Sequence, residues 1–235
     1  MYKAIIFDLD NTLLNYSLSE LDSMKKTLRD HRLFVNEEAK WEAFWESYTK
    51  HNFKHWMNFV NKIGPHASIE EVLISSFRDS LNLHSTQHEH LSRTYWDYFC
   101  NTCYFEDGAE DVLHYLKPKY KLGIISNGIS VAQRKRLAVG NIYETFQSIV
   151  VSDEAGVRKP SKEIFDISLR ELGLGNEEVL FVGDSLTDDY HGARNADIDF
   201  CYYNRKNDRL SDEYQPKYIV KELQELLRVI GAENR

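Results

Sequence analysis

Two patterns of hydrophobic and polar positions divide this chain. Residues 1–16 and 106–235 contain short apolar runs, rich in β-branched and aromatic residues, separated by stretches in which apolar positions recur every three or four residues. Residues 17–105 show only the second pattern, for example at Trp41 and Trp45. Short apolar runs are typical of buried strands, and the recurrence at three and four is typical of amphipathic helices. The chain therefore predicts strands and helices in its first and last segments, and helices alone between them.

The order of the predicted elements indicates the class of fold. Strands and helices alternate in the last segment, which predicts an α/β protein built on a doubly wound parallel sheet. The predicted strands are residues 3–7, 121–126, 148–152, 178–183, 198–203 and 218–220, and the predicted helices of the last segment are residues 111–117, 131–139, 162–172, 187–195 and 221–230.

The helical segment interrupts the sheet, because one predicted strand precedes it and the others follow it. We therefore expect residues 1–16 and 106–235 to form one α/β core domain, and residues 17–105 to form an inserted all-helical cap domain. The insertion leaves the core directly after the first strand, so we expect it to act as a lid over any site at the end of that strand.

Composition and charge exclude several classes of partner. The 235 residues are 42% hydrophobic and 28% charged, as in an ordinary soluble globular protein. A net charge of −8 argues against binding to a nucleic-acid polymer. No apolar stretch approaches the ~20 residues that span a bilayer, and Met1 leads into the first strand without a signal segment. We expect a cytoplasmic protein with no membrane partner, and the sequence indicates no particular oligomeric state.

The three cysteines, Cys100, Cys103 and Cys201, argue against a disulfide framework and favour a reducing compartment. Cys100 and Cys103 form a C-x-x-C motif. No second pair of Cys or His residues with suitable spacing completes a zinc site, and the motif lies in a helical segment. Two thiols near a helix end explain the motif better than redox or metal chemistry does.

Two acids, Asp8 and Asp10, directly follow the first predicted strand. Open α/β sheets bind ligands outside the carboxyl ends of their strands. Two carboxylates at such a position repel each other unless a cation lies between them. The pair therefore predicts a metal site with acid/base chemistry.

Three further polar motifs follow later strands in order. Ser126 and Asn127 bring a hydroxyl and main-chain N–H groups to the end of the second strand, where they suit an anionic phosphoryl group. Lys159 comes after the third strand, and Pro160 biases it away from helix. Asp184 follows the fourth strand and adds a carboxylate at the same edge of the sheet.

These residue types match the demands of phosphoryl transfer. A carboxylate can attack phosphorus, Mg²⁺ prefers carboxylate and phosphate oxygens, and a lysine can neutralise the transferring oxygens. Taken singly, each motif is also explained as a turn, a solvated loop or a helix cap. Their occurrence in order, each after a predicted strand, favours a single site.

The same residues form four motifs that resemble those of the haloacid dehalogenase (HAD) superfamily. The motifs are Asp8-Leu9-Asp10-Asn11-Thr12, Ser126-Asn127, Lys159-Pro160, and Gly183-Asp184-Ser185 followed by Asp189. They span the predicted core nearly end to end, and the helical insertion after the first motif resembles the C1-type cap of that superfamily. The resemblance implies a HAD-like Rossmannoid core, a hydrolase, and Mg²⁺ as its cofactor.

The resemblance also implies roles for the acids and the lysine. Asp8 would be the nucleophile, forming an aspartyl-phosphate, and would bind the metal. Asp10 would protonate the leaving oxygen, then activate the hydrolytic water, and would bind the metal through its main-chain carbonyl. Lys159 would bridge the nucleophile and the phosphate, and Asp184 would complete the metal shell.

The remaining motif positions have supporting roles by the same resemblance. Thr12, Ser126 and Asn127 would bind the substrate. Asp189 would lie behind the metal ligands as a supporting acid. Asp188 is an additional acid to which the resemblance assigns no role.

Finer features resemble the pyrimidine 5′-nucleotidase branch of the superfamily. They include Gln133, Arg136 and Glu154, whereas Asp197 departs from the pattern at a turn that usually contains glycine. The branch hydrolyses nucleoside monophosphates such as those of deoxyuridine and thymidine. The resemblance therefore implies a 5′-nucleotidase whose partner is a small phosphorylated metabolite.

Three other functions fit the same scaffold. A phosphatase for a sugar phosphate or phosphoglycolate would use the same core residues. A hydrolytic 2-haloacid dehalogenase also uses an aspartate nucleophile, without Mg²⁺, but related dehalogenases typically lack an acid two residues later, so Asp10 argues against this chemistry. A non-catalytic phospho-ligand-binding protein is disfavoured because every catalytic position is filled.

Aromatic side chains in the insertion have two interpretations. Most should form the core of the insertion, while one or two could stack on a nucleobase. The candidates for stacking are Trp41, Trp45, Phe53 and Trp56. His51 and His55, one helical turn apart, fit a solvated helix face better than a metal pair.

Overall fold

The computed structural model describes residues 1–233 and divides into two compact units. The first unit contains Met1–Leu18 and the chain from Cys103 onward, and the second contains Ser19–Thr102. The domain boundaries predicted from the sequence, after residues 16 and 105, differ from this division by a few residues.

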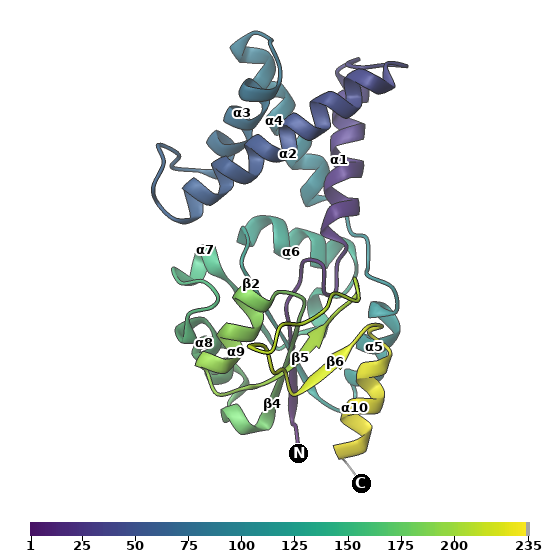
Figure 1. Cartoon of the computed structure of the whole chain (residues 1–235), viewed down its shortest axis with the longest axis vertical. Coiled ribbons are helices and arrows are strands. Elements are labelled where there is room, and N and C mark those ends of the chain that lie inside the picture. Colours follow the sequence, from purple (N-terminus) through teal and green to yellow (C-terminus); the bar gives the residue numbers. More distant parts are fainter. Residues whose placement is uncertain (234–235) are drawn as a thin grey trace. The chain divides into compact units, whose positions relative to one another are not determined.

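A six-stranded parallel sheet forms the centre of the first unit (Figure 1). Its strands lie in the order β3-β2-β1-β4-β5-β6. They are β1 (Ala4–Phe7), β2 (Lys121–Ser126), β3 (Ser148–Val151), β4 (Val179–Gly183), β5 (Asp199–Tyr203) and β6 (Tyr218–Val220). This topology confirms the predicted α/β class with a doubly wound parallel sheet and a helical insertion after the first strand.

Helices cover both faces of the sheet, since successive side chains of a strand point to opposite faces. In β1, Ile5 and Phe7 belong to one buried cluster and Ala4 and Ile6 to the other. The first cluster includes residues of α5 (Ala109–Leu116), α6 (Ser130–Val139) and α10 (Glu225–Glu233), and the second includes residues of α8 (Lys162–Leu172) and α9 (His191–Asn195). Both faces are therefore buried, which explains why the strands are nearly uniformly apolar.

The element after β4 differs from the single helix predicted over residues 187–195. It begins as a π-helical turn, η3 (Leu186–Tyr190), and continues as α9. The main-chain oxygen of Ser185 accepts from the N–H groups of both Asp189 and Tyr190, at 3.0 Å each. Such wide turns are frequent at functional sites, and this one carries Asp189.

The end of the chain also differs from prediction. The last helix begins at Glu225 and not at Lys221. The Glu225 carboxylate accepts hydrogen bonds from the N–H groups of Lys221 (2.7 Å) and Glu222 (3.4 Å), which holds the residues before the helix in turns.

A further difference lies after β3, at the opposite edge of the sheet. The predicted strand extends to residue 152, but a one-turn helix, α7 (Ser152–Ala155), begins at this residue.

The two chain segments that join the units lie side by side within the first unit. The Asn15 N–H donates to the Tyr104 carbonyl at 2.8 Å, and the Glu106 N–H donates to the Leu13 carbonyl at 2.9 Å. Leu14 and Phe105 form an antiparallel bridge between these bonds. The outgoing and returning segments are thus fixed to each other by main-chain pairing.

The second unit is helical. It contains α2 (Glu38–Val60), α3 (Ile69–Ser80), α4 (Ser85–Cys100) and most of α1 (Tyr16–Asp30). Its core is aromatic: the rings of Phe44, Tyr48, Phe77 and Tyr95 are buried and pack with centroids 5.0–6.3 Å apart.

The four aromatic residues that were candidates for base stacking lie outside that core. Trp41, Trp45 and Trp56 are half-buried, and Phe53 is 66% exposed. Trp41 and Trp45 stack on each other with centroids 5.4 Å apart.

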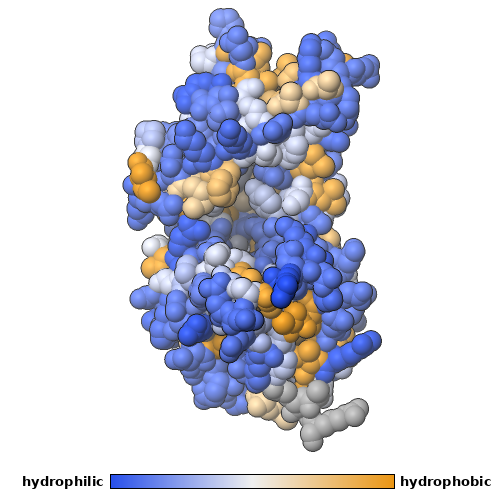
Figure 2. Space-filling model, in the orientation of Figure 1, coloured by the Kyte–Doolittle hydropathy of each residue, from blue (hydrophilic) through white to orange (hydrophobic). Residues whose placement is uncertain are grey.

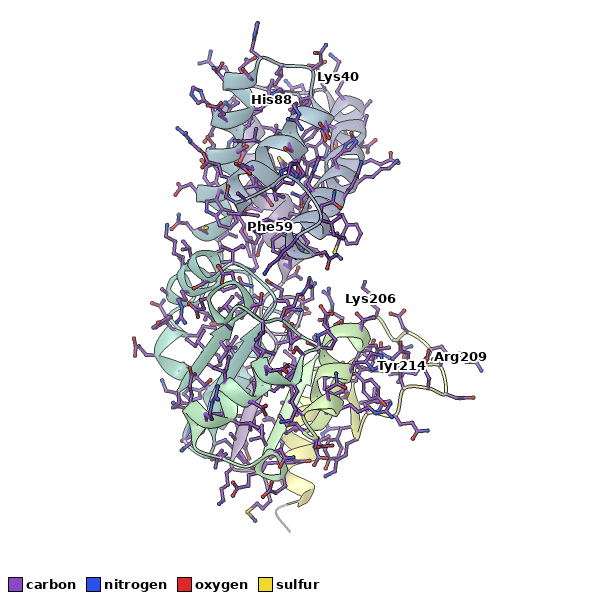
Figure 3. All side chains as sticks on the ribbon, turned by 90° about the vertical axis from the view of Figure 1, so that its left-hand side faces the viewer. Lys40, Phe59, His88, Lys206, Arg209 and Tyr214 are labelled. Carbon is purple, nitrogen blue, oxygen red and sulfur yellow. The ribbon has the colours of Figure 1, made fainter. Side chains whose placement is uncertain are left out.

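The prediction of a solvated helix face at His51 and His55 is wrong for His55. His55 is buried because α3 and the loop before it pack against this side of α2. Its ring nitrogens lie 2.9 Å from Asp79 Oδ2 and 2.9 Å from His66 Nε2. His88, labelled in Figure 3, is buried as well, with Nε2 3.0 Å from the Leu81 carbonyl oxygen.

The surface shown in Figure 2 is mostly hydrophilic, with hydrophobic side chains in small separate groups. Within residues 1–233, none of the helices combines the length and apolar character needed to cross a membrane. The three cysteines are free thiols. Burial raises the pKa of the Cys103 thiol to about 11, which makes it a poor nucleophile.

Candidate active site

The carboxyl ends of three adjacent strands bring the predicted site residues together. Asp8 follows β1, Ser126 ends β2, and Asp184 follows β4, and these strands are neighbours in the order β2-β1-β4. The Asp8 N–H continues the ladder by donating to the Val182 carbonyl at 2.8 Å. The edge of the sheet therefore positions these side chains through main-chain pairing.

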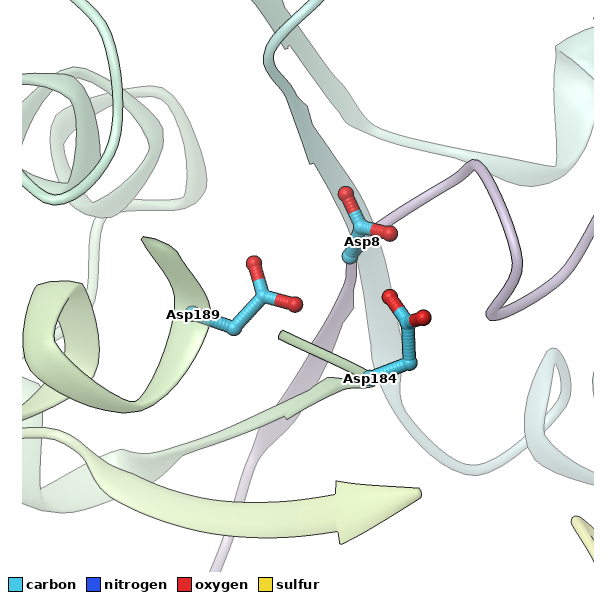
Figure 4. A group of neighbouring side chains, drawn as sticks. All are labelled: Asp8, Asp184 and Asp189. Atoms are coloured by element: carbon cyan, nitrogen blue, oxygen red, sulfur yellow. The ribbon is translucent and has the colours of Figure 1, made fainter. Parts of the chain in front are cut away.

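Three carboxylates form a compact cluster at this edge (Figure 4). Asp8, Asp184 and Asp189 each contribute one oxygen, and these oxygens lie within 4.8 Å of one another. Asp8 and Asp189 are buried, and Asp184 is half-buried. Gly183 makes room for the cluster, since a Cβ at this position would lie 2.3 Å from Asp189 Oδ2.

Lys159 is the cation within this cluster. Its Nζ donates to Asp8 Oδ1 at 2.5 Å and to Asp189 Oδ1 at 2.7 Å, and the side chain is 2% exposed. Burial alone would lower the pKa of Lys159, but the charges of Asp189 and Asp8 outweigh it and raise the pKa above its usual range. Lys159 is therefore a charged bridge between the two acids.

The cluster as a whole has an excess of negative charge. Burial, together with the charges of Asp189 and Asp184, raises the pKa of Asp8 well above its usual value, despite the opposing effect of Lys159. Burial and the charge of Asp189 raise the pKa of Asp184 to about 7. If all three carboxylates are ionised together, the cluster and its one ammonium carry two excess negative charges, which a divalent cation would balance.

Asp189 accepts hydrogen bonds from the protein through both of its carboxylate oxygens. Its Oδ1 accepts from Lys159, and its Oδ2 accepts from the Ser185 N–H at 2.9 Å. Both oxygens thus have protein partners, which suits a supporting acid. Asp188, to which no role was assigned, lies outside the carboxylate cluster and accepts from Asn127 Nδ2 at 3.0 Å.

The carboxylate of Asp10 points to a different set of partners. Its Oδ1 accepts from Arg136 Nη1 at 2.6 Å, and its Oδ2 accepts from Gln133 Nε2 at 2.6 Å. The same Gln133 nitrogen donates to Ser126 Oγ at 2.9 Å. Asp10 and Ser126 are thus joined through one amide.

Gln133 and Arg136 belong to the features that resemble the nucleotidase branch, but the sequence predicts no role for either residue. The signal that could have identified them is their spacing on α6. They lie one helical turn apart on the side that also carries Ala132 and Leu137, and all four side chains are buried. Buried polar groups require specific partners, so a charged and an amide side chain on this face indicate a buried acceptor.

The two other predicted substrate-binding residues lie at the same end of the sheet but have different surroundings. The Asn127 side chain contacts the main chain of Lys159 at two points, 2.8 and 3.0 Å. The Thr12 hydroxyl is fully buried and has no hydrogen-bond partner among the described residues.

Comparisons with known proteins identify the family. The model of the family of haloacid dehalogenase-like hydrolases matches residues 5–203. The putative HAD-hydrolase YfnB of Bacillus subtilis is 27% identical over 236 residues, covering 99% of this chain and 97% of that protein. Pyrimidine 5′-nucleotidase PynA of Streptococcus pneumoniae is 29% identical over 232 residues, covering 96% and 94%. A glyceraldehyde 3-phosphate phosphatase of Pyrococcus abyssi is 29% identical over 244 residues, covering 100% and 96%.

Solved structures show the same fold. The crystal structure of YfnB bound to magnesium is similar with a TM-score of 0.80 at 26% identity, covering 97% of this chain and 98% of that one. A 2-haloacid dehalogenase from Pseudomonas syringae is similar with a TM-score of 0.68 at 22% identity, covering 99% of each chain. The second likeness concerns the fold alone.

Proposed function

Because this chain belongs to the family of haloacid dehalogenase-like hydrolases, we propose that it is a Mg²⁺-dependent phosphatase for small phosphomonoesters. We propose a nucleoside 5′-monophosphate as the preferred ester. The observation that carries the phosphatase proposal is the buried Lys159 ammonium, which bridges Asp8 and Asp189 beside Asp184. Such an arrangement supplies a nucleophile and a fixed cation for the oxygens of a transferring phosphoryl group.

The reaction begins with attack by Asp8. A bond forms between an Asp8 carboxylate oxygen and phosphorus, and the bond from phosphorus to the ester oxygen breaks. Asp10 gives a proton to the departing oxygen. Lys159 Nζ, which already donates a hydrogen bond to Asp8, can also donate to a phosphoryl oxygen and hold the aspartyl-phosphate in place.

The second step regenerates the enzyme. Asp10, now ionised, removes a proton from a water molecule, and the water oxygen attacks phosphorus. The bond between phosphorus and Asp8 breaks, releasing inorganic phosphate and the free carboxylate. The Ser126 hydroxyl and the main-chain N–H groups after it are suited to bind the phosphate oxygens through both steps.

The donor set fits Mg²⁺. We propose that Asp8 and Asp184 bind the ion through their carboxylates and Asp10 through its main-chain carbonyl, with Asp189 behind them. All are oxygen donors, and the unbalanced charge of the cluster corresponds to a divalent cation. When bound, Mg²⁺ supplies positive charge to the phosphate oxygens and allows the clustered carboxylates to be ionised together.

Two full-length relatives bear on the choice of ester. PynA is named a pyrimidine 5′-nucleotidase, and its similarity, together with the residues that resemble that branch, supports a nucleoside monophosphate. The Pyrococcus enzyme is named a glyceraldehyde 3-phosphate phosphatase, and its sequence identity to this chain, 29%, is the same as that of PynA. A triose phosphate is therefore the second candidate substrate.

A phosphate-release assay with Mg²⁺ tests both parts of the proposal. The panel contains pyrimidine and purine nucleoside 5′-monophosphates, glyceraldehyde 3-phosphate, a sugar phosphate and phosphoglycolate, with 2-chloropropionate as a halide-release control. We expect pyrimidine monophosphates to give the highest kcat/KM. We also expect activity to disappear with a chelator and in Asp8→Asn, which keeps the shape of the side chain but removes the nucleophilic charge.

Each contrary result removes a defined part of the proposal. If pyrimidine monophosphates rank among the poorest substrates, the nucleotidase assignment is wrong and the phosphatase assignment stands. Halide release without Mg²⁺ and with all phosphate esters intact would overturn the phosphatase assignment. Phosphatase activity that persists in Asp8→Asn would remove Asp8 as the nucleophile.

A further inference from the structure

A buried amide connects two groups of the candidate active site. Gln133 Nε2 donates to Asp10 Oδ2 at 2.6 Å and to Ser126 Oγ at 2.9 Å, and Gln133 Oε1 accepts from Arg136 Nη1 at 2.9 Å. Gln133 is 2% exposed and Arg136 is fully buried, so water does not compete for these bonds.

The orientation of this amide is fixed by the chemistry of its neighbours. A guanidinium has donors only, so Arg136 requires the oxygen of Gln133. In the ionised form that activates the water, the Asp10 carboxylate accepts only, so it requires the nitrogen. Both requirements are met in one orientation, and the two protons of Nε2 are then directed to Asp10 and Ser126.

The orientation determines the role of Ser126. Because the Ser126 oxygen accepts from Gln133, its own proton remains available for another acceptor. The oxygens of a phosphomonoester are mostly deprotonated at neutral pH and act as acceptors. Gln133 therefore leaves the Ser126 hydroxyl free to donate its proton, and an anionic substrate needs a donor at this position.

The same pair holds both oxygens of Asp10. Arg136 Nη1 binds Oδ1 at 2.6 Å and Gln133 Nε2 binds Oδ2 at 2.6 Å, while the Asp10 side chain keeps 25% exposure. A carboxylate held at two points cannot rotate freely about its last bond, although it remains accessible from outside. This is the condition under which a proton can be transferred along a defined direction.

Space for this arrangement is built into the strand-to-helix turn. A Cβ on Gly128 would lie 2.6 Å from Gln133 Nε2, so only glycine at this position leaves the amide in place. The turn that follows Ser126 and the helix that carries Gln133 are thus matched to each other.

We propose that Gln133 and Arg136 are positioning residues that orient the Asp10 carboxylate and set the Ser126 hydroxyl as a donor, so that proton transfer and phosphate binding are coupled through one amide. The inference rests on the proposed phosphatase function. It goes beyond that function because it assigns roles to two residues that act through Asp10 and Ser126.

The choice of leaving group separates this role from a purely structural one. An alkyl phosphate such as thymidine 5′-monophosphate has a poor leaving group that needs the proton from Asp10. p-Nitrophenyl phosphate releases a stabilised phenolate that does not need it. Hydrolysis of the aspartyl-phosphate needs Asp10 with either substrate, since the water must be deprotonated.

The experiment compares Gln133→Met and Arg136→Lys with Lys135→Met, which alters an exposed residue of the same helix. In Gln133→Met we expect kcat for the alkyl ester to fall about 100-fold, the cost typical of a misplaced catalytic group. With p-nitrophenyl phosphate, rapid mixing should show a burst of nitrophenolate equal to the enzyme concentration, because the first step is spared and the second is slow.

Two further comparisons serve as controls. Arg136→Lys, which keeps the charge, should retain more activity than Arg136→Met, and Lys135→Met should behave like the parent. Thermal unfolding of each variant identifies any that fail to fold, and Gln133→Glu, which keeps the shape but places an oxygen against Asp10, replaces Gln133→Met if the latter is unfolded.

Contrary outcomes separate this inference from the function on which it rests. A folded Gln133→Met that loses activity equally on both substrates, without a burst, overturns the positioning role. The same holds if it loses no more than Lys135→Met while the parent is active. A parent that hydrolyses none of the phosphate esters overturns the proposed function, and this inference with it.

Discussion

The side-chain amide of Asn127 binds both main-chain polar groups of Lys159. Asn127 Oδ1 accepts from the Lys159 N–H at 2.8 Å, and Asn127 Nδ2 donates to the Lys159 carbonyl at 3.0 Å. A residue at the end of β2 thus fixes the peptide from which the buried lysine extends to Asp8. The sequence alone indicated substrate binding for Asn127, and the structure adds a contact through which it can position the lysine.

Replacing Asn127 should therefore affect Lys159. In Asn127→Ala both polar groups of Lys159 lose their partners, and we expect a loss of about 1–3 kcal/mol in the free energy of unfolding. We also expect kcat to fall at least 10-fold, because the ammonium is no longer held at its position. Denaturant unfolding and steady-state kinetics measure the two effects. Asn127→Asp keeps the acceptor but places a carboxylate oxygen against Asp188 Oδ2 and the Lys159 carbonyl, so it should not restore the lost activity. Unchanged kinetics in both variants would contradict the positioning of Lys159 by Asn127.

Removing the lysine should have a larger effect. Lys159→Met leaves Asp8 and Asp189 buried without their shared cation, and breaking a buried ion pair on one side typically costs about 3–5 kcal/mol. We expect that loss in the metal-free protein, measured by urea unfolding with a chelator. Lys162→Met, which removes a surface ion pair with Asp166, is the matched control and should change stability by less than about 1 kcal/mol. Equal effects of the two substitutions would show that the bridge does not contribute to folding.

A side chain at Gly183 should displace Asp189 and destabilise the protein. In Gly183→Ala the new Cβ would meet Asp189 Oδ2 at 2.3 Å, so the acid must move and its bonds to Ser185 and Lys159 must weaken. We expect destabilisation of about 1–3 kcal/mol, as for overpacked interiors, and reduced activity. The control is Gly231→Ala in α10, where a Cβ meets nothing within 4 Å. Alanine is the better helix former, so this substitution should be neutral or stabilising by up to about 1 kcal/mol. Thermal unfolding of both variants distinguishes the clash from a general effect of replacing glycine.

The stability of the metal-free protein should fall as the pH rises from about 4 to about 7. The pKa of Asp184 is about 7 in the folded protein and 3.8 in the unfolded chain, because burial and the charge of Asp189 disfavour its ionised form. Between these values the folded state binds more protons than the unfolded state, so the free energy of unfolding decreases with rising pH. The measurement is the unfolding midpoint against pH in a chelator. Asp184→Asn, which does not titrate, should flatten this slope, and a slope identical to that of the parent would refute the assignment.

Mg²⁺ should reverse this trend. Binding requires ionised carboxylates, so the affinity for the ion should increase as the pH rises through about 7. An ion that binds only the folded state raises the unfolding midpoint with concentration. We expect the increase in midpoint caused by Mg²⁺ to be larger at pH 8 than at pH 6, and to be lost in Asp184→Asn. An increase of the same size at both pH values would argue against carboxylate ligands.

Much of the fold could be predicted because the central strands of this sheet are buried on both faces. Its strands are apolar runs that end in polar residues, so both the elements and the position of the site follow from local pattern. Asp8, Ser126 and Asp184 lie together because parallel strands end at one edge. The start of the last helix could not be predicted, because the Glu225 carboxylate binds main-chain groups before the helix and this depends on local geometry.

The part of the site that could not be predicted depends on tertiary contacts. Gln133 contacts Ser126 at the end of β2, and both Gln133 and Arg136 contact Asp10 in the loop after β1. Asp10 lies 123 residues before Gln133, so no local pattern specifies this contact. The surroundings of His55 were misjudged for a similar reason, since Asp79 and His66 come from other segments. The side chain of Asn127 was interpreted from its motif, and its contacts with Lys159 depend on how two loops meet.

The pairing of the outgoing and returning segments at Leu13–Asn15 and Tyr104–Glu106 gives the insertion a single narrow point of attachment. These two segments hydrogen-bond to each other, so the chain leaves and re-enters the first unit at neighbouring positions. Domains whose two ends lie close together are tolerated as insertions, so this unit is suited to exchange as a whole. A chimaera in which the helical unit, residues 19–102, comes from a relative would therefore test whether this unit or the α/β unit determines which ester is hydrolysed.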